Sequence, residues 1–253
     1  MGIAVITGAA SGIGACTKAR LETQGYEIIG IDLKGEIISA DLSTAEGRQV
    51  AIDQTLEKCG GKIDRLVLAA GLGGHLANGA LVAKVNYFGA VTLLDGFKDA
   101  LAATKGRCVV IGSNSSQMRT DPKAPMVEAM LEGDEAKTIE IIGDFHAAMV
   151  YGHSKHAVTR AARRRAAEWG ELGISLNVIA PGPTETPMLQ GVKDDPVISK
   201  SLEMIPIPQK RFGRAEEITD IIEFMLSDTA DYMQGSVIYV DGGTDAQLRP
   251  DAF

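Results

Sequence analysis

The amino-acid sequence predicts one α/β domain built on a doubly wound parallel sheet. Short apolar runs rich in β-branched residues alternate with longer stretches of helical length throughout the 253 residues. The short runs are apolar at nearly every position, as expected of strands that are buried on both faces of a parallel sheet. The connections are short, and no linker, repeat or low-complexity tract divides the chain. We therefore expect a single domain over residues 1–253.

Six strands and five helices follow from these patterns. The expected strands are Ile3–Thr7, Glu27–Ile31, Leu66–Ala70, Cys108–Ile111, Ser175–Ala180 and Val237–Val240. The expected helices are Ile13–Gln24, Ala45–Lys58, Ala90–Ala103, His153–Trp169 and Ala215–Leu226, with Trp169 and Met225 in the core. A helix between two strands carries the chain back across the sheet, so consecutive strands run parallel.

Two segments interrupt this alternation. Residues 117–147 contain Pro122, Pro125 and several acidic residues, and residues 186–214 contain four further prolines. The second is long and mostly apolar, which is typical of a lid over an active site, although packing into the core is an equal alternative for its apolar residues. The first has the apolar spacing of short amphipathic helices, at Met126, Met130 and Leu131 and then at Ile139, Ile142 and Phe145, and the apolar residues of the second include Met188, Leu189, Met204 and Ile205.

Composition and charge exclude several classes of function. The formal net charge is −8, which provides no general attraction for nucleic acid or for an anionic membrane. No apolar run approaches the ~18 residues of a membrane span, and the start of the chain lacks the pattern of a secretory signal. The three cysteines, Cys16, Cys59 and Cys108, are odd in number and lack metal-ligand spacing, so we expect buried thiols. A cytoplasmic protein is the expectation.

A glycine-rich turn follows the first expected strand. Residues Thr7-Gly8-Ala9-Ala10-Ser11-Gly12-Ile13-Gly14 lead directly into the first helix. Glycines permit the tight turn and the close approach of backbone to a pyrophosphate, and the helix N-terminus supplies N–H groups and a favourable dipole. Asp32 ends the second strand, where its carboxylate can accept hydrogen bonds from the ribose hydroxyls and repel the 2′-phosphate of NADP. The sequence therefore predicts an NAD site on Gly8, Ser11, Gly12, Ile13, Gly14 and Asp32.

Tyr151 and Lys155 lie four residues apart, on one face of an expected helix. A free phenol has a pKa of about 10, too high for a general base at neutral pH. A neighbouring ammonium favours the phenolate, so we expect Lys155 to lower the pKa of Tyr151. The pair therefore predicts a general acid/base at Tyr151 that exchanges a proton with an alcohol or carbonyl oxygen.

In these features the sequence resembles the short-chain dehydrogenase/reductase family over nearly the whole chain. The resemblance implies that Tyr151 transfers the proton, that Ser113 holds the substrate oxygen, and that Lys155 binds the nicotinamide ribose. It also implies that Asn86 supports a water that relays protons to Lys155. Asp41 and Leu42 would flank the adenine, Gly71 would border the adenosine ribose, and Thr184 and Thr186 would hold the carboxamide. The matching elements are Thr7–Gly14, Asp32, Asp41-Leu42, Leu68–Gly71, Asn86, Ser113, Tyr151 with Lys155, Asn177, Pro181-Gly182 and Asp241–Gly243.

Two departures from the family pattern are informative. Ala69 stands where the family usually has Asn, which affects the bracing of the sheet more than the chemistry. Ser113 and Tyr151 are 38 residues apart, whereas about 13 is usual, and the 117–147 insertion accounts for the difference. With the insertion, the chain is similar to the bacterial 3α-hydroxysteroid dehydrogenase/carbonyl reductase group, on Ile31-Asp32, Ala40–Arg48, Val85–Ala90, Thr184–Pro187 and Leu248–Pro250. In that group the insertion covers the helix face through which relatives form tetramers, which implies a homodimer through another surface.

The remaining polar clusters have ordinary interpretations. His153 and His156 have a spacing that a zinc pair can use, but no third ligand accompanies them and the tyrosine mechanism needs no metal, so we expect none. His153 is expected on the helix surface, and His75 is expected to be solvated in its Gly-rich loop rather than to contact substrate. The arginine cluster at Arg160 and Arg163–Arg165 suits exposed ion pairs or a subunit contact better than phosphate binding.

These observations predict reversible NAD(H)-dependent oxidation of a secondary alcohol to a ketone. The apolar lid favours a bulky small-molecule substrate such as a 3α-hydroxysteroid, and an aryl alcohol or xenobiotic carbonyl is the alternative within the same chemistry. A non-catalytic nucleotide-binding regulator is the alternative of another class. The presence of Ser113, Tyr151 and Lys155 together argues against it.

Overall fold

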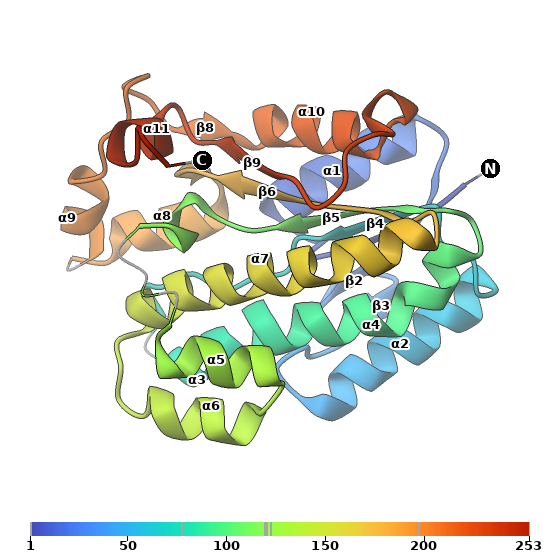
Figure 1. Cartoon of the computed structure of the whole chain (residues 1–253), viewed down its shortest axis with the longest axis horizontal. Coiled ribbons are helices and arrows are strands. Elements are labelled where there is room, and N and C mark those ends of the chain that lie inside the picture. The colour runs from blue at the N-terminus through green and yellow to red at the C-terminus, as the bar shows by residue number, and fades with distance from the viewer. Residues whose placement is uncertain (1, 77, 119–120, 122, 197, 253) are drawn as a thin grey trace.

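A computed structural model describes residues 2–76, 78–118, 121, 123–196 and 198–252 (Figure 1). Seven parallel strands form one sheet in the order β3-β2-β1-β4-β5-β6-β9. The predicted doubly wound parallel sheet is confirmed. Its strands are β1 (Ile3–Thr7), β2 (Glu27–Asp32), β3 (Ile38–Ser39), β4 (Arg65–Leu68), β5 (Arg107–Ile111), β6 (Ser175–Pro181) and β9 (Val237–Val240). Among the strands of this sheet, the two-residue β3 was not predicted, because it is too short to show an apolar pattern.

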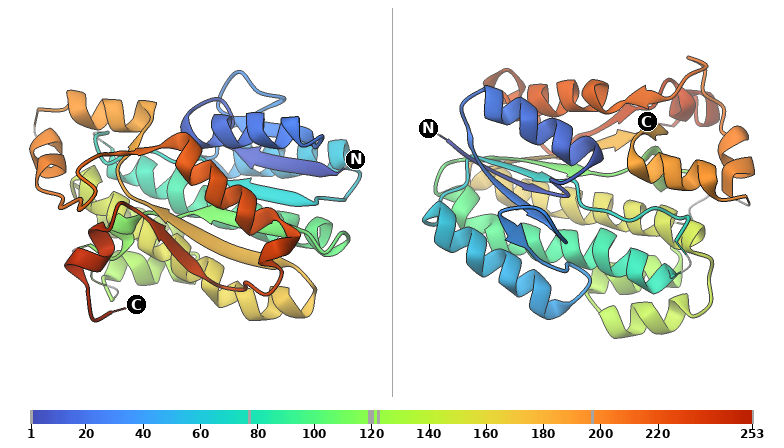
Figure 2. Two further views of the ribbon diagram at one scale, coloured as in Figure 1. Left: turned by 90° about the horizontal axis from the view of Figure 1, so that it is seen from above. Right: turned by 180° about the vertical axis from the view of Figure 1, so that it is seen from behind.

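Helices cover both faces of the sheet (Figures 1 and 2). On one face, α1 (Gly12–Thr23) and α10 (Ala215–Leu226) pack against each other and enclose a core that includes Met225. On the other face lie α2 (Ala45–Cys59), α4 (Ala90–Ala102) and α7 (Ala147–Glu171), over a larger core that includes Trp169. Both residues are 1% exposed, as predicted. Helix α7 begins six residues before its predicted start, so Tyr151 lies inside it.

The 117–147 insertion forms two helices outside this second layer. They are α5 (Pro125–Glu132), which packs on α7, and α6 (Glu135–Ile142), which packs on α3 (Gly79–Ala83) (Figure 1). The predicted apolar positions are buried or partly buried except Phe145, which is exposed because it follows the end of α6 at Gly143. The buried Arg48 of α2 binds Glu135 at 2.7 Å and ties the insertion to the body of the protein. Pro122 lies outside the described residues.

The expected lid follows β6 and is closed by a separate two-stranded sheet. Its two strands, β7 (Thr184–Glu185) and β8 (Gly213–Arg214), pair in parallel and bring the two ends of the lid together. Between them lie α8 (Pro187–Asp194) and α9 (Ile198–Glu203), at one end of the molecule (Figure 1). In α8 only Leu189 is buried, and the described residues of α9 include no buried one. The segment therefore has little core of its own, which is typical of elements that open locally.

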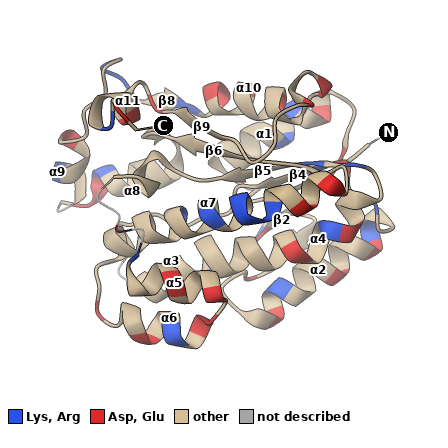
Figure 3. Cartoon of the chain, in the orientation of Figure 1, with Lys and Arg blue, Asp and Glu red and all other residues tan. Residues whose placement is uncertain are grey.

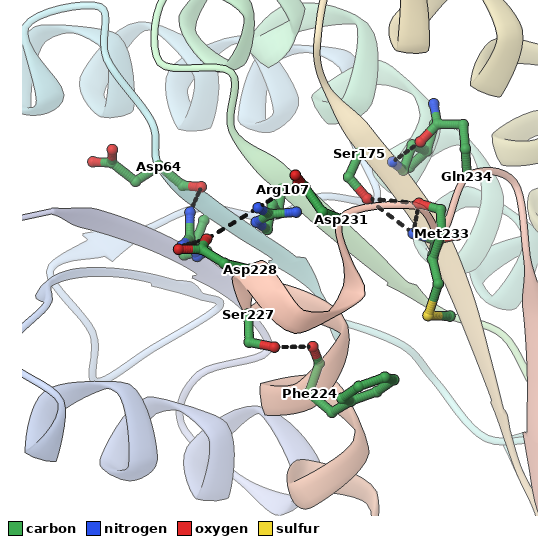
Figure 4. Close-up of polar contacts among 12 residues, drawn as sticks. Asp64, Arg107, Ser175, Phe224, Ser227, Asp228, Asp231, Met233 and Gln234 are labelled. Atoms are coloured by element: carbon green, nitrogen blue, oxygen red, sulfur yellow. Dashed lines mark hydrogen bonds and ion pairs between the residues drawn. The ribbon is translucent and has the colours of Figure 1, made fainter.

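Arg107, at the amino-terminal end of β5, fixes the connection from α10 to β9 (Figure 4). This 8%-exposed side chain at the start of β5 donates hydrogen bonds to Asp228 at 3.0 Å and to Asp231 at 2.8 Å. Beside it, Ser175 and Asn177 of β6 both donate to the carbonyl oxygen of Met233. The chain then enters β9 and ends after α11 (Thr244–Leu248). In the part of the chain that the structure describes, no helix has the length and apolar character needed to span a membrane.

Candidate active site

A cavity of about 690 Å³ lies at the carboxyl ends of the strands. It spans the point between β1 and β4 where the strand order reverses, the place at which doubly wound sheets bind ligands. All but one of the predicted catalytic and cofactor-binding residues line it. They are Gly8, Ser11, Gly12, Ile13, Gly14, Asp32, Asp41, Leu42, Gly71, Ser113, Tyr151, Lys155, Thr184 and Thr186. Asn86 is the exception and lies behind the wall.

The glycine turn after β1 requires glycine at two positions. A methyl group on Gly14 would lie 2.1 Å from the carbonyl oxygen of Gly8, and one on Gly8 would lie 2.8 Å from the backbone nitrogen of Ala70. Gly8 and Gly12 also have positive φ angles, of 67° and 54°. Ser11 is the N-cap residue of α1 but makes no side-chain capping hydrogen bond. The N–H groups of the first turn are therefore available to an anion such as a pyrophosphate.

Asp32 is held against this turn. Its Oδ2 accepts a hydrogen bond from the backbone nitrogen of Ala10 at 3.0 Å, and its Oδ1 accepts one from that of Leu33 at 2.7 Å. These bonds fix a negative charge at the end of β2, on the wall of the cavity. The position suits recognition of ribose hydroxyls and opposes an additional phosphate.

Asp41 and Leu42 form the next part of the wall. Hydrogen bonds from the side chain and backbone of Ser43 lower the pKa of Asp41, so this carboxyl is ionised at neutral pH. Leu42 is 7% exposed and packs beside Gly89, where a methyl group would lie 3.2 Å from the Leu42 Cβ. The two side chains provide one polar and one apolar edge for a flat ring.

Ser113 follows β5 and caps the short 3₁₀ turn Asn114–Ser116. Its Oγ accepts hydrogen bonds from the backbone nitrogen of Ser115 at 3.2 Å and from the hydroxyl of Ser115 at 2.8 Å. With both acceptor positions occupied, its own hydrogen is free to point to Tyr151, with which Ser113 is hydrogen-bonded. Ser115 was not singled out from the sequence, and a serine after a serine carries no distinguishing pattern.

The pKa of Tyr151 differs from the prediction. Burial raises it above the ordinary value, and the hydrogen bond from Ser113 opposes that rise. The pKa of Tyr151 in the cofactor-free site is therefore raised, contrary to the predicted lowering, because loss of solvation disfavours the phenolate. In this state Tyr151 is a neutral phenol that can donate a proton.

Lys155 is buried in α7, one turn beyond Tyr151. It is 4% exposed, and its Nζ donates a hydrogen bond to the carbonyl oxygen of Ile111 at 2.9 Å. Burial lowers the pKa of Lys155 to about 8. The ammonium therefore remains the major form at neutral pH and begins to lose its proton only slightly above it.

Asn86 lies in a π-helical turn, Lys84–Gly89, and is 1% exposed. Its Oδ1 accepts from the backbone nitrogen of Leu72 at 2.7 Å, and its Nδ2 donates to the carbonyl oxygen of Leu72 at 3.0 Å. A methyl group on Gly71 would lie 3.3 Å from this Oδ1 and 3.4 Å from Nζ of Lys155. Asn86 thus braces the loop after β4 beneath Lys155, and the predicted water relay stays a prediction. A π-turn widens a helix by one residue, a change that the sequence does not announce.

Thr184 and Thr186 form the wall of the cavity that follows β6. The hydroxyl of Thr184 donates to the carbonyl oxygen of Gly182 at 2.9 Å, and that of Thr186 donates to the carbonyl oxygen of Thr184 at 3.1 Å. Thr186 also accepts from the backbone nitrogen of Leu189 and so caps α8. The two threonines join β6 to the lid.

Most of the remaining cavity wall is apolar, with Ser43, Asn114, Ser115 and Ser201 as its polar members. On one side lie Leu72 of the loop after β4, Leu81 of α3 and Val85 of the π-helical turn. Of these, only Val85 had been named from the sequence, within Val85–Ala90. The lid faces them and contributes Met188, Leu189, Val192, Ile198, Leu202 and Ile205. Of the four predicted lid residues, Met204 is instead 71% exposed and lies outside the cavity wall. The arrangement leaves an apolar chamber beside Ser113 and Tyr151.

The expectations for the histidines need correction. His153 is buried rather than on the surface, and its Nδ1 contacts the carbonyl oxygen of Met149 at 2.8 Å. His75 is half-buried rather than solvated, and it does not line the cavity. Cys59 and Cys108 are buried as expected, but Cys16 is only partly so.

Two of the four arginines of the cluster on α7 form ion pairs with neighbouring helices. Arg165 binds Asp95 of α4 at 2.7 Å, and Arg160 binds Glu128 of α5 at 3.0 Å. Figure 3 shows acidic residues of α4 and α5 beside the basic stretch of α7. The cluster therefore joins helices of this layer.

Comparison with known proteins agrees with this geometry. Residues 2–125 match the family described as short chain dehydrogenase, and residues 138–245 match the one described as enoyl-(acyl carrier protein) reductase. The chain belongs to the short-chain dehydrogenase/reductase family of oxidoreductases, as the sequence motifs predict.

Several relatives within that family match over nearly their whole length. The chain is 44% identical to a 3-alpha-hydroxysteroid dehydrogenase/carbonyl reductase of Comamonas testosteroni, with 100% of each chain covered. The crystal structure of the 3-alpha-hydroxysteroid dehydrogenase from Pseudomonas sp. B-0831 complexed with NADH has a TM-score of 0.97 and 43% identity, covering 99% of this chain and 100% of that one. A coniferyl-alcohol dehydrogenase of Pseudomonas sp. is 30% identical, over 94% of both chains. The predicted similarity to the hydroxysteroid dehydrogenase group is confirmed.

The buried Lys155 predicts a pH-dependent stability of the cofactor-free protein. Its pKa is about 8 in the fold against an ordinary value of 10.5, so between these values the unfolded chain binds more protons than the folded one. The free energy of unfolding should therefore gain from Lys155 as pH rises, with a slope of up to ~1.4 kcal/mol per pH unit. Urea unfolding of the wild type and Lys155→Met across this window measures the effect as the difference between their slopes. Equal slopes would contradict the prediction.

Proposed function

We propose that this protein catalyses reversible NAD(H)-dependent oxidation of a secondary alcohol to a ketone on a bulky apolar substrate such as a 3α-hydroxysteroid. The observation that carries the proposal is that one cavity is lined by the glycine turn, by the hydrogen-bonded pair Ser113 and Tyr151, and by an apolar chamber. Two relatives matched over nearly their full length are named as 3-alpha-hydroxysteroid dehydrogenases, and one of them is bound to NADH. They support the cofactor and the substrate class.

The residues of the glycine turn fit a dinucleotide. The uncapped N-terminus of α1 would bind the pyrophosphate, Asp32 the adenosine ribose, and Asp41 with Leu42 the adenine edge. Gly71 borders the same channel, and Thr184 and Thr186 lie where they would orient a carboxamide. When bound, the nicotinamide accepts or donates the hydride at the substrate carbon. The protein itself therefore has to manage only the proton and the orientation of the substrate.

Proton transfer is assigned to Tyr151. In the direction of ketone reduction, the neutral phenol donates its proton to the substrate oxygen, while Ser113 donates a second hydrogen bond to the same oxygen. In the direction of alcohol oxidation, the phenolate accepts the hydroxyl proton, and Ser113 stabilises that phenolate until the substrate arrives. Lys155 would bind the ribose, and its ammonium form would favour the Tyr151 phenolate. Asn86 would hold the loop beneath Lys155. The lid residues exclude water from the chamber.

Removal of the Tyr151 hydroxyl should abolish turnover without loss of cofactor. Tyr151→Phe should lower kcat by roughly 10²- to 10⁴-fold, because a positioned general acid/base contributes about that much. NADH absorbance with NAD and a panel of steroids measures the rate, and NADH fluorescence measures binding. Tyr232→Phe, at a fully exposed tyrosine, is the matched control. Near-normal turnover by Tyr151→Phe would overturn the mechanism, and faster turnover of aryl alcohols than of steroids would favour the coniferyl-alcohol relative as the guide to substrate.

The preference for NAD should depend on Asp32. Asp32→Ser removes the charge that opposes a 2′-phosphate, so the ratio of kcat/KM for NAD to that for NADP should fall at least about tenfold. Asp53→Ser, at an exposed residue of α2, should leave the ratio as it is. Initial rates with each cofactor provide the measurement. An unchanged ratio in Asp32→Ser would assign the preference to another group.

We also propose that the chain forms a homodimer through β9 and α10. All four residues of the edge strand β9 are only partly buried, and Phe224 of α10 is 41% exposed. The insertion already covers α7 and α3 on the other side. The three free thiols support a reducing compartment such as the cytoplasm.

A charge in this apolar face should dissociate the dimer. Phe224→Glu should sediment as a monomer at concentrations at which the wild type is dimeric, because an unpaired carboxylate cannot be buried without a large cost. Phe145→Glu places the same charge on a similarly exposed aromatic residue of the insertion side and should remain dimeric. Dissociation by Phe145→Glu alone would place the interface on the insertion.

A further inference from the structure

His75 occupies a slot between the loop after β4 and the lid helix α8. A methyl group on Gly191 of α8 would lie 2.6 Å from Nε2 of His75, and one on Gly73 would lie 2.7 Å from its Nδ1. Real side chains do not approach so closely, so the imidazole is in direct contact with both backbones. The slot exists because both positions lack a side chain.

Shape rather than hydrogen bonding holds the ring at its Nδ1 edge. That atom is buried and has no hydrogen-bond partner among the residues that the structure describes. A buried polar atom without a partner costs free energy, so hydrogen bonding at Nδ1 does not account for the position of the ring. The ring therefore acts as a spacer of fixed size between two main chains.

The two main chains that His75 separates are opposite walls of the apolar chamber. Leu72, Gly73 and Gly74 line it on one side, and Met188, Leu189 and Val192 line it on α8. Met188 is one helical turn before Gly191 and also reaches the loop, since its Cγ lies 3.0 Å from the methyl position of Gly73. Contact between the lid and this loop thus runs through His75 and its neighbour Met188.

We propose that His75 is a positioning residue that seats α8 and thereby sets the width of the substrate chamber. The inference rests on the proposed function for its substrate, a bulky polycyclic ketone or alcohol, but not for its contact. Because α8 has little core of its own, the fit of His75 against Gly191 decides where the lid closes. The residue governs the fit of a large substrate and takes no part in proton transfer.

The contact makes a specific prediction for Gly191→Ala. In an isolated helix, alanine is more favourable than glycine, so this substitution would stabilise α8 if nothing opposed it. With His75 present, the new methyl group meets the ring at 2.6 Å and has to displace the lid. With His75→Ala, the obstacle is gone and the methyl group enters vacated space. The two substitutions should therefore be strongly non-additive.

The test compares wild type, His75→Ala, Gly191→Ala and the double variant. Hydrogen exchange of residues 187–196 in the NADH-bound protein reports lid closure without reference to turnover. Each single variant should exchange at least roughly fivefold faster in α8, as expected for the loss of a modest contact, and the double variant should return toward the wild-type rate. The KM for a bulky steroid should follow the same order, with kcat changed less. Gly170→Ala, a helical glycine of α7 whose nearest neighbour is the Gln234 side chain at 3.3 Å, is the control for the glycine substitution.

Additive effects of the two substitutions, or an unchanged α8 exchange rate in His75→Ala, would overturn the proposal. If no steroid is turned over by the wild type, the proposed substrate fails, and the exchange rates still decide whether His75 seats the lid. If steroids are turned over but the double variant shows no rescue in exchange or KM, the proposed function stands and the role of His75 does not.

Discussion

The common direction of the seven strands is the constraint on which the site depends. Because all strands are parallel, their carboxyl ends meet at one edge, and the turns after β1, β2, β4, β5 and β6 converge there. Between β1 and β4 the connections leave toward opposite faces, which opens the cavity without any loss of backbone pairing. Gly14 and Gly8 can then approach each other closely enough for a helix N-terminus to face the cavity. The site is thus a consequence of the sheet order rather than an addition to it.

The same burial that stabilises the fold controls the chemistry of Tyr151 and Lys155. Loss of solvation favours the neutral form of both residues, so it raises the pKa of the phenol and lowers that of the ammonium. Polar groups at the carboxyl end of β5 limit this effect. Ser113 supports the phenolate, and the carbonyl oxygen of Ile111 supports the ammonium. The strand therefore provides both the support for α7 and the local electrostatics that make proton exchange possible.

Much of this architecture can be predicted because it depends on patterns that are local in sequence. The buried strands are recognised by continuous apolar runs, and the glycine turn by the steric demands at Gly8 and Gly14. Other features depend on contacts that are distant in sequence. The bracing of Leu72 by Asn86 requires a π-turn, and the burial of His153 requires a helix that begins earlier than its pattern. The pKa of Tyr151 depends on solvation in the assembled site, so spacing to Lys155 alone gave the wrong direction.

The division between what can and cannot be predicted follows a physical division within the molecule. The reaction is carried out by groups at strand ends and on α7, where dense packing fixes each position and restricts the residues that can occupy it. The substrate is instead enclosed by an excursion between β7 and β8 that has little core, so its wall can change without loss of the fold. Contacts such as that of His75 with Gly191 decide the shape of this wall, and they join residues more than a hundred positions apart. The class of reaction can therefore be predicted from local motifs, whereas the choice of substrate depends on how the weakly packed lid between β7 and β8 is positioned.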